Sequence, residues 1–205
     1  MSVESPGRKR REAGCARDPS SRLAPRDLAR PLTVVRSSCA TPHSGVEGPR
    51  VLIYTGDVLG LGHVRRNTTI AKRLVAELPD TNVLLLTSVP TANFFEPLRG
   101  IEFIKLPSVR KLPSGGFCSQ ALEIDGAGFW KLRTGVIESV ARHYRPDLVL
   151  VDHLPAGVAG DLLPAVRALR NASRPPRIVL GLRDVLDDPA EIETRWHDAG
   201  IYRAI

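Results

Sequence analysis

Short, continuously apolar runs alternate with stretches of helical periodicity after Pro49, and this alternation most constrains the fold. The runs are rich in Val, Ile and Leu, a pattern typical of strands that are buried on both faces. Strands are predicted at residues 51–54, 82–87, 101–106, 147–152 and 177–182. Helices are predicted at about residues 63–78, 129–144, 156–170 and 188–205. Strands that alternate with helices predict right-handed β-α-β units, and therefore an α/β fold with a doubly wound parallel sheet.

Residues 1–49 differ in composition from the rest of the 205-residue chain. They contain nine of the 29 Lys and Arg residues but only five of the 22 acidic residues, so they carry more than half of the net charge of +7. They are rich in Pro, Ser, Gly and Arg, without a hydrophobic period, which predicts a disordered basic tail. The run Arg8-Lys9-Arg10-Arg11 is a possible contact for nucleic acid or an anionic membrane. A single short run without aromatic residues favours a solvated tail, to which we assign no function and no nucleic-acid partner.

Several classes of protein are disfavoured by what the chain lacks. The cysteines Cys15, Cys39 and Cys118 are odd in number and far apart, which fits neither a disulfide framework nor a metal site. No Asp-x-Asp occurs, so a divalent cation bridging a nucleotide diphosphate in that manner is not expected. No apolar run approaches the ~20 residues that span a bilayer. The basic N-terminus is not followed by the apolar segment of a secretory signal. We therefore expect a reduced, cytoplasmic protein without an integral membrane segment.

The segment Gly60-Leu61-Gly62-His63 joins the first strand to the first helix. Ligands of such sheets bind at the carboxyl ends of the strands, where glycines allow close approach and a helix N-terminus favours anions. The dinucleotide fingerprint would need glycine in place of Arg65, and no Gly-Lys-Ser/Thr follows, so NAD, FAD and P-loop chemistry are disfavoured. His63 is a candidate general base, and equally a residue that caps the helix. Arg66 and Asn67, three and four positions on, are expected on its face.

Two further polar clusters follow predicted strands. Asp152 and His153 end the fourth strand, where they could orient a catalytic group or bind a hydroxylated ligand; capping of the next helix is slightly favoured. Arg183 and Asp184, with the following 187–189, are expected to pair with each other and to cap the last helix rather than to bind substrate. Trp130 and Trp196 are expected as core or interface anchors.

Four segments of the chain carry a resemblance to a known family. They are Tyr54-Thr55-Gly56-Asp57-Val58-Leu59-Gly60-Leu61-Gly62-His63-Val64-Arg65-Arg66-Asn67, Leu106-Pro107-Ser108-Val109, Val151-Asp152-His153-Leu154-Pro155 and Leu180-Gly181-Leu182-Arg183-Asp184-Val185-Leu186-Asp187-Asp188-Pro189. In the same order, they resemble segments of predicted bacterial glycosyltransferases related to the MurG-like family, whose first loop carries a similar Gly-x-Gly-His followed by basic residues. The resemblance covers about residues 50–205, and several ordered segments make it more specific than Gly-x-Gly-His alone. The family pattern has a polar residue, often His, where this chain has Gly56.

The resemblance implies a GT-B architecture, in which two Rossmann-like domains enclose the reaction. Residues 50–205 would form the N-terminal, acceptor-side domain, incomplete at its end, and the nucleotide-sugar donor would bind a C-terminal domain outside this chain. On that basis the isolated chain is expected to be inactive, and neither a cofactor nor a metal is assigned to it. His63 would be catalytic by activating the acceptor. The substrate-binding residues would be Gly60, Gly62, Arg66, Asn67, Asp152 and His153.

The acceptor implied by the resemblance is a small molecule or a lipid-linked one, which leaves peripheral contact with a membrane open. Nucleotide-sugar hydrolases of similar two-domain fold also carry Gly-x-Gly-His-x-x-Arg, a spacing that residues 60–66 satisfy. In such an enzyme His63 would activate water. A fragment that is inactive, or that only binds a partner, is the remaining alternative. The sugar, the acceptor and the oligomeric state are not predicted.

Overall fold

A computed structural model of the chain describes residues 48–56, 61–78, 80–89, 99–182, 188–198 and 200–204. Every described residue belongs to one compact unit, within Pro42–Ile205. The predicted tail, apart from Gly48 and Pro49, lies outside the described residues.

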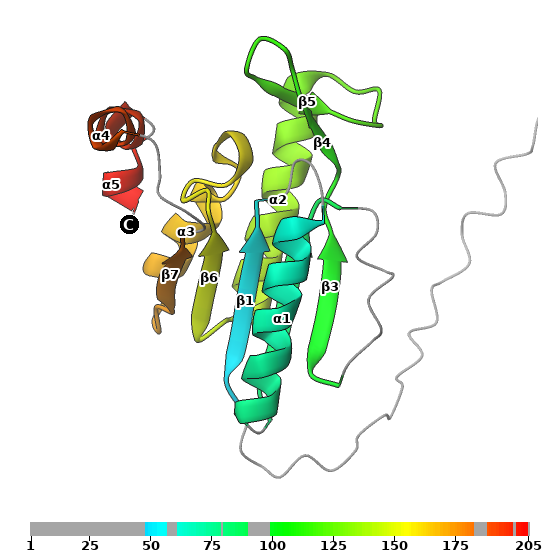
Figure 1. The fold of residues 1–205 in the computed structure, drawn as a ribbon, viewed down its shortest axis with the longest axis vertical. Coiled ribbons are helices and arrows are strands. Elements are labelled where there is room, and N and C mark those ends of the chain that lie inside the picture. Colours follow the sequence, from blue (N-terminus) through cyan, green and yellow to red (C-terminus); the bar gives the residue numbers. More distant parts are fainter. Residues whose placement is uncertain are drawn as a thin grey trace, which may run out of the picture. The chain divides into compact units, whose positions relative to one another are not determined.

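Five parallel strands form the central sheet, in the order β3-β2-β1-β6-β7. Figure 1 shows β3, β1, β6 and β7 in that order across the sheet. Their bounds are β1 Arg50–Thr55, β2 Asn82–Thr87, β3 Ile101–Lys105, β6 Leu148–Asp152 and β7 Arg177–Gly181. All five coincide with the predicted apolar runs to within one or two residues, and all are parallel. The expected α/β class with a parallel, Rossmann-like sheet is therefore confirmed.

Helices cover both faces of this sheet, which explains why its inner strands β1, β2 and β6 are apolar without alternation, whereas the edge strands β3 and β7 are partly exposed. On one face, α1 (Gly62–Glu77) packs through Ala71 and Leu74 against the odd-numbered side chains of β1. On the other face, α2 (Gly126–Tyr144) and α3 (Leu163–Arg170) pack against Leu52 and Tyr54. Figure 1 shows α1 and α2 on opposite sides of the sheet. Successive side chains of β1 thus enter two separate cores, and both must be apolar.

The structure differs from the prediction mainly in one hairpin and in two helices. The segment after β3 forms an antiparallel hairpin, β4 (Val109–Lys111) and β5 (Phe117–Ser119), which was not predicted. The helix expected at 156–170 is a short 3-10 turn, η2 (Val158–Gly160), followed by α3, because left-handed backbone at residues 157, 159 and 160 interrupts a regular helix. The last helix is divided into α4 (Pro189–Asp198) and α5 (Ile201–Ala204) at Gly200, whose φ is +65°.

The order of the strands creates a switch point between β1 and β6. From β1 the chain proceeds outward through β2 to β3, then crosses back through α2 to β6, on the other side of β1. Thr55 and Asp152, the last residues of β1 and β6, are register partners at this point. Ligands of open α/β sheets bind outside the carboxyl ends of the strands at such a switch point. Candidate site residues lie at this point, because Asp152 ends β6 and His63 lies at the start of α1, the helix that follows β1.

Candidate functional site

The carboxylate of Asp152, at the end of β6, is the centre of the site. It is 1% exposed and is bonded to three side chains of α1. His63 Nδ1 lies 2.7 Å from Oδ2, Asn67 Nδ2 donates to the same oxygen at 2.7 Å, and Arg66 Nη1 donates to Oδ1 at 3.1 Å. Sequence reasoning named all four residues, and the structure brings them together.

The helical spacing of α1 explains this convergence. His63, Arg66 and Asn67 occupy positions i, i+3 and i+4, which share one face of a helix, as predicted. The capping alternatives, applied to His63, Asp152 and His153, are wrong, because neither α1 nor η2 nor α3 begins with a side-chain capping bond. Leu61 is the N-cap of α1 and makes no side-chain capping bond, while His63 bonds to Asp152. The carboxylate of Asp152 in turn bonds to α1, not to the helical turn that begins six residues later.

The contact between His63 and Asp152 determines which ring nitrogen carries the proton. An ionised carboxylate only accepts hydrogen bonds, so the proton lies on Nδ1. In the neutral ring, Nε2 then carries the lone pair that accepts a proton. The side chain of His63 is 14% exposed, whereas that of Asp152 is 2% exposed. A buried carboxylate that orients a more accessible histidine is the arrangement by which general bases are held in their reactive tautomer.

Arg66 and Asn67 complete the coordination of the carboxylate. Asn67 is 1% exposed and also donates to the backbone oxygen of His63 at 3.0 Å, so it ties the base and its carboxylate together. Arg66 extends further and donates through Nη2 to the backbone oxygen of Leu182, just beyond β7, at 3.0 Å. The side chain of Arg66 is 34% exposed and remains accessible to solvent. Together they link α1 to the ends of β6 and β7.

His153 lies beside this cluster in an unusual backbone conformation. Its φ of +67° is in the left-handed region, which costs a residue with a side chain about 1–2 kcal/mol. Its backbone N–H donates to the oxygen of Gly181 at 3.0 Å. Its ring centroid is 5.9 Å from that of His63, and its buried Nδ1 has no hydrogen-bond partner in the described part of the chain. Two imidazole rings therefore lie next to each other at the switch point.

The glycines of the predicted loop have different surroundings. A Cβ added at Gly56 would lie 3.1 Å from the backbone oxygen of Asp152 and 3.3 Å from Leu154 Cδ1, so this strand end is too close to β6 for a side chain without a shift. A Cβ added at Gly62 would meet nothing within 4 Å, so internal packing does not require a glycine there. Gly60 lies outside the described residues.

The third predicted cluster is described only in part. Arg183, Asp184 and Asp187 lie outside the described residues. Asp188 Oδ1 accepts a hydrogen bond from the backbone N–H of Ala190 at 2.9 Å, which confirms that Asp188 caps α4. Trp130 packs beside Phe129 in a small core cluster, and the ring of Trp196 lies 6.0 Å from that of Tyr202.

A second buried polar network, which sequence reasoning missed, lies at the same end of the sheet. Arg133 of α2 is fully buried, and its Nε donates to Asp161 Oδ2 at 2.7 Å. Its Nη1 donates to Ser88 Oγ, beyond β2, at 2.9 Å and to the backbone oxygen of Pro107, beyond β3. Tyr54 of β1 donates its hydroxyl hydrogen to Asp161 Oδ1 at 2.8 Å. Arg133 thus connects the segments that follow β2 and β3 to Asp161, and Asp161 in turn bonds to Tyr54 of β1.

Burial changes the acidity of several groups in and around this network. Desolvation raises the pKa of the Tyr54 hydroxyl, and the nearby Asp161 carboxylate raises it further. Burial also raises the pKa of Asp161, while the positive charge of Arg133 and the hydroxyl of Tyr54 act in the opposite direction. The pKa of Lys105 is lowered, first by burial and then by the charge of Arg133. Tyr54 consequently remains a hydroxyl that donates a hydrogen bond.

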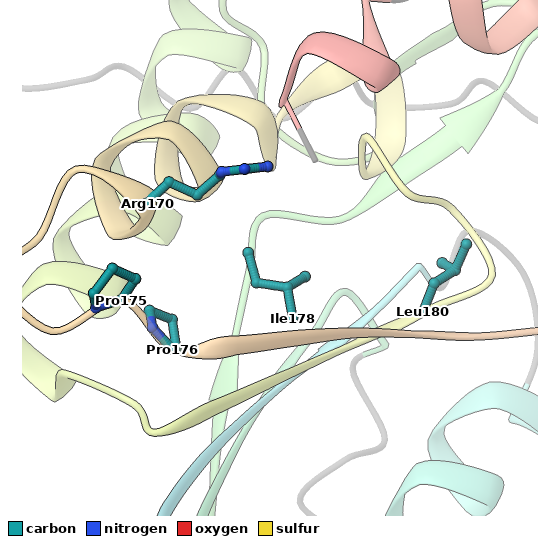
Figure 2. Close-up of a pocket in the computed structure, with 5 residues that line it drawn as sticks. All are labelled: Arg170, Pro175, Pro176, Ile178 and Leu180. Atoms are coloured by element: carbon teal, nitrogen blue, oxygen red, sulfur yellow. The ribbon is translucent and has the colours of Figure 1, made fainter.

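A hollow of about 410 Å³ lies away from the candidate site, against β7. Figure 2 shows Ile178 and Leu180 of this strand on one side, Arg170 at the end of α3, and two prolines that precede the strand. Its lining contains none of the predicted site residues. The predicted site is thus distinct from this hollow.

The described residues contain neither a metal-binding cluster nor a membrane-spanning helix. Among them, no group of three or more His, Cys, Asp or Glu side chains is arranged to hold a metal ion. Cys118 is a free thiol, and the other two cysteines lie outside the described residues. No helix in the described ranges is long and apolar enough to cross a membrane.

The chain was compared with protein-family models, with curated proteins and with solved structures. No family model, curated protein or solved structure matches it.

Proposed function

We propose that residues 50–205 supply the acceptor side of a glycosyltransferase active site of the MurG-like, GT-B type, with His63 as the general base. The observation that carries this proposal is the 2.7 Å contact between His63 Nδ1 and the buried carboxylate of Asp152 at the switch point of the sheet. The resemblance described above suggests the reaction class, and a histidine held by a buried carboxylate at the switch point supports it.

In the proposed reaction an acceptor hydroxyl loses its proton to Nε2 of His63. The acceptor oxygen forms a bond to the anomeric carbon of the sugar, and the bond from that carbon to the nucleoside diphosphate breaks. The diphosphate departs with the electron pair. Asp152 keeps the proton on Nδ1 and stabilises the imidazolium that forms, while Arg66 and Asn67 hold the carboxylate. The nucleotide-sugar donor is assigned to a second domain, outside these residues.

Hydrolysis of a nucleotide sugar is the second candidate, and one contact favours it. Arg66 is the arginine of the spacing Gly-x-Gly-His-x-x-Arg, and it contacts the same carboxylate as the histidine. The same base would then take a proton from water. Release of free sugar without any acceptor indicates hydrolysis, whereas sugar joined to an added acceptor indicates transfer.

The test begins with the native protein, isolated from its own cells with an antibody against residues 50–205. The proposal requires a donor-binding domain, so the product should have about twice the 22.3 kDa of this chain, or be isolated with a partner that supplies that domain. The isolated protein is then incubated with a panel of uridine, guanosine, adenosine and thymidine diphosphate sugars, and release of the nucleoside diphosphate is measured. A product of 22.3 kDa that has no such partner and turns over none of these donors contradicts the proposal.

The role of His63 is tested in the same assay. His63→Ala should lower the rate about 10²–10⁴-fold, the usual contribution of a general base. His143→Ala, which removes an exposed histidine near the end of α2, is the matched control and should leave the rate unchanged. A rate for His63→Ala within about threefold of the wild type would refute general-base catalysis by this residue.

A further inference from the structure

The segment that follows β6 is held in a strained conformation by a buried network. Left-handed backbone occurs at His153, Gly157, Ala159 and Gly160, with φ of +67°, +75°, +52° and +82°. Two of these residues have side chains, for which this conformation is unfavourable. The segment therefore needs contacts with other parts of the chain to keep this backbone conformation. Asp161, at the end of the segment, makes such contacts.

Those contacts come from groups that are fully buried. Arg133 donates to Asp161 Oδ2, and Tyr54 donates to Oδ1. The backbone N–H of Val158 donates to the Tyr54 hydroxyl oxygen at 3.0 Å. A side chain at Gly157 would overlap Asp161 Oδ1, so the segment is also packed closely against this carboxylate. The hydroxyl of Tyr54 thus connects two points of the strained segment, Val158 and Asp161.

The same segment begins with His153, whose ring lies 5.9 Å from that of His63. The network does not touch either ring in the described contacts, but it determines the path of the chain that carries one of them. We propose that the buried Arg133–Asp161 ion pair, with Tyr54, positions the His153 ring beside His63 by holding the segment 153–161, with its four left-handed residues, in place. A contribution of the His153 ring to catalysis rests on the proposed function. The position of this ring is tested without substrate.

The experiment uses the 205-residue chain with ¹⁵N- and ¹³C-labelled histidine. Tyr54→Phe removes one hydroxyl and leaves the ring that fills the core. The expected result is a shift of the His153 ring resonances and loss of most of the cross-relaxation between His153 and His63. Tyr144→Phe is the matched control, because the Tyr144 hydroxyl donates to the backbone oxygen of Asn82, at the opposite end of the sheet. It should leave both histidine rings unchanged.

A rescue distinguishes positioning from a general loss of stability. Ala159→Gly removes the conformational cost at φ +52°, so the double variant Tyr54→Phe/Ala159→Gly should regain the wild-type resonances of His153. Unchanged His153 resonances in Tyr54→Phe would overturn the inference. So would equal disturbance by Tyr144→Phe, or a double variant that stays disturbed. None of these outcomes depends on sugar transfer, so failure here is separate from failure of the proposed function.

Discussion

Replacement of Asp152 by alanine tests how much of the fold depends on the candidate site. The carboxylate is 1% exposed and accepts hydrogen bonds from three side chains. Its removal takes the acceptor from the Nδ1 hydrogen of His63 and from one of the two N–H groups of Asn67 Nδ2, while the other still donates to the backbone oxygen of His63. Asn67 is 1% exposed and the side chain of His63 is 14% exposed, and each buried donor that loses its partner costs about 1–3 kcal/mol. Arg66 is 34% exposed and can turn to water, so its share is below about 1 kcal/mol. The expected loss is therefore about 3–5 kcal/mol, as for other broken buried pairs.

Urea denaturation followed by circular dichroism measures this loss. With a slope of about 2 kcal/mol per molar urea, a loss of 4 kcal/mol corresponds to a decrease of about 2 M in the midpoint. Asp147→Ala is the matched control at the amino end of β6: its side chain is 32% exposed and accepts from the Arg50 backbone N–H, so about 1 kcal/mol is expected. Asp152→Asn should fall between the two, because it keeps one acceptor oxygen. Equal midpoints for Asp152→Ala and Asp147→Ala would refute the estimate.

Two further predictions concern backbone and ionisation. Gly157→Ala should lower the free energy of unfolding by about 2 kcal/mol or more, because a side chain there overlaps Asp161 and is strained at φ +75°. Gly62→Ala, with open space around it, should change the free energy of unfolding by less than about 1 kcal/mol. Denaturation of both variants checks this. Burial raises the pKa of Tyr144 to about 12 from its usual value of about 10, so the unfolded chain loses this proton first, and the free energy of unfolding falls as pH rises from 10 towards 12. Tyr144→Phe should flatten this fall in denaturation measured across that range, while Tyr202→Phe, at a half-exposed position, should not; equal slopes in the two variants would contradict the assignment.

The sheet was predictable because its strands carry their information locally. Every residue of a strand buried on both faces must be apolar, and such runs are visible without knowledge of the fold. The hairpin of β4 and β5 was missed because its strands have only three residues each and include Arg110 and Lys111. The turn between them contains Pro113 and two glycines, a signal that could have been used. The helix predicted from residue 156 was wrong because its first residues make tertiary contacts that outweigh helical propensity.

The candidate site was predictable in part for a similar reason. The helical positions of His63, Arg66 and Asn67 follow from sequence spacing alone. Their contact with Asp152 requires β6 to lie beside β1, which depends on the order of strands in the sheet and on no local pattern. The sequence therefore names the residues, whereas the topology brings them together.

Arg133 lies within a periodic apolar stripe that predicts a buried ion pair. Phe129, Arg133, Ile137 and Ala141 recur at intervals of four residues and are the buried residues of α2. An arginine within an apolar stripe needs a buried anion, because an unpaired charge is rarely buried. The pattern thus predicts that an acidic partner exists. It does not identify Asp161, because that residue follows β6 by nine positions in a segment without regular periodicity.

Two carboxylates, Asp152 at the end of β6 and Asp161 nine residues later, have contrasting environments. Asp161 is bonded to Arg133 and Tyr54, both fully buried, so its partners have no access to a ligand from solvent. Asp152 is equally buried, but its partners His63 and Arg66 are 14% and 34% exposed at their side chains. Proton exchange with a bound hydroxyl requires a group that is held by the protein and also reaches the ligand. That requirement favours the His63–Asp152 pair for chemistry and the Arg133–Asp161 pair for positioning, because only the first joins a fixed carboxylate to an accessible base.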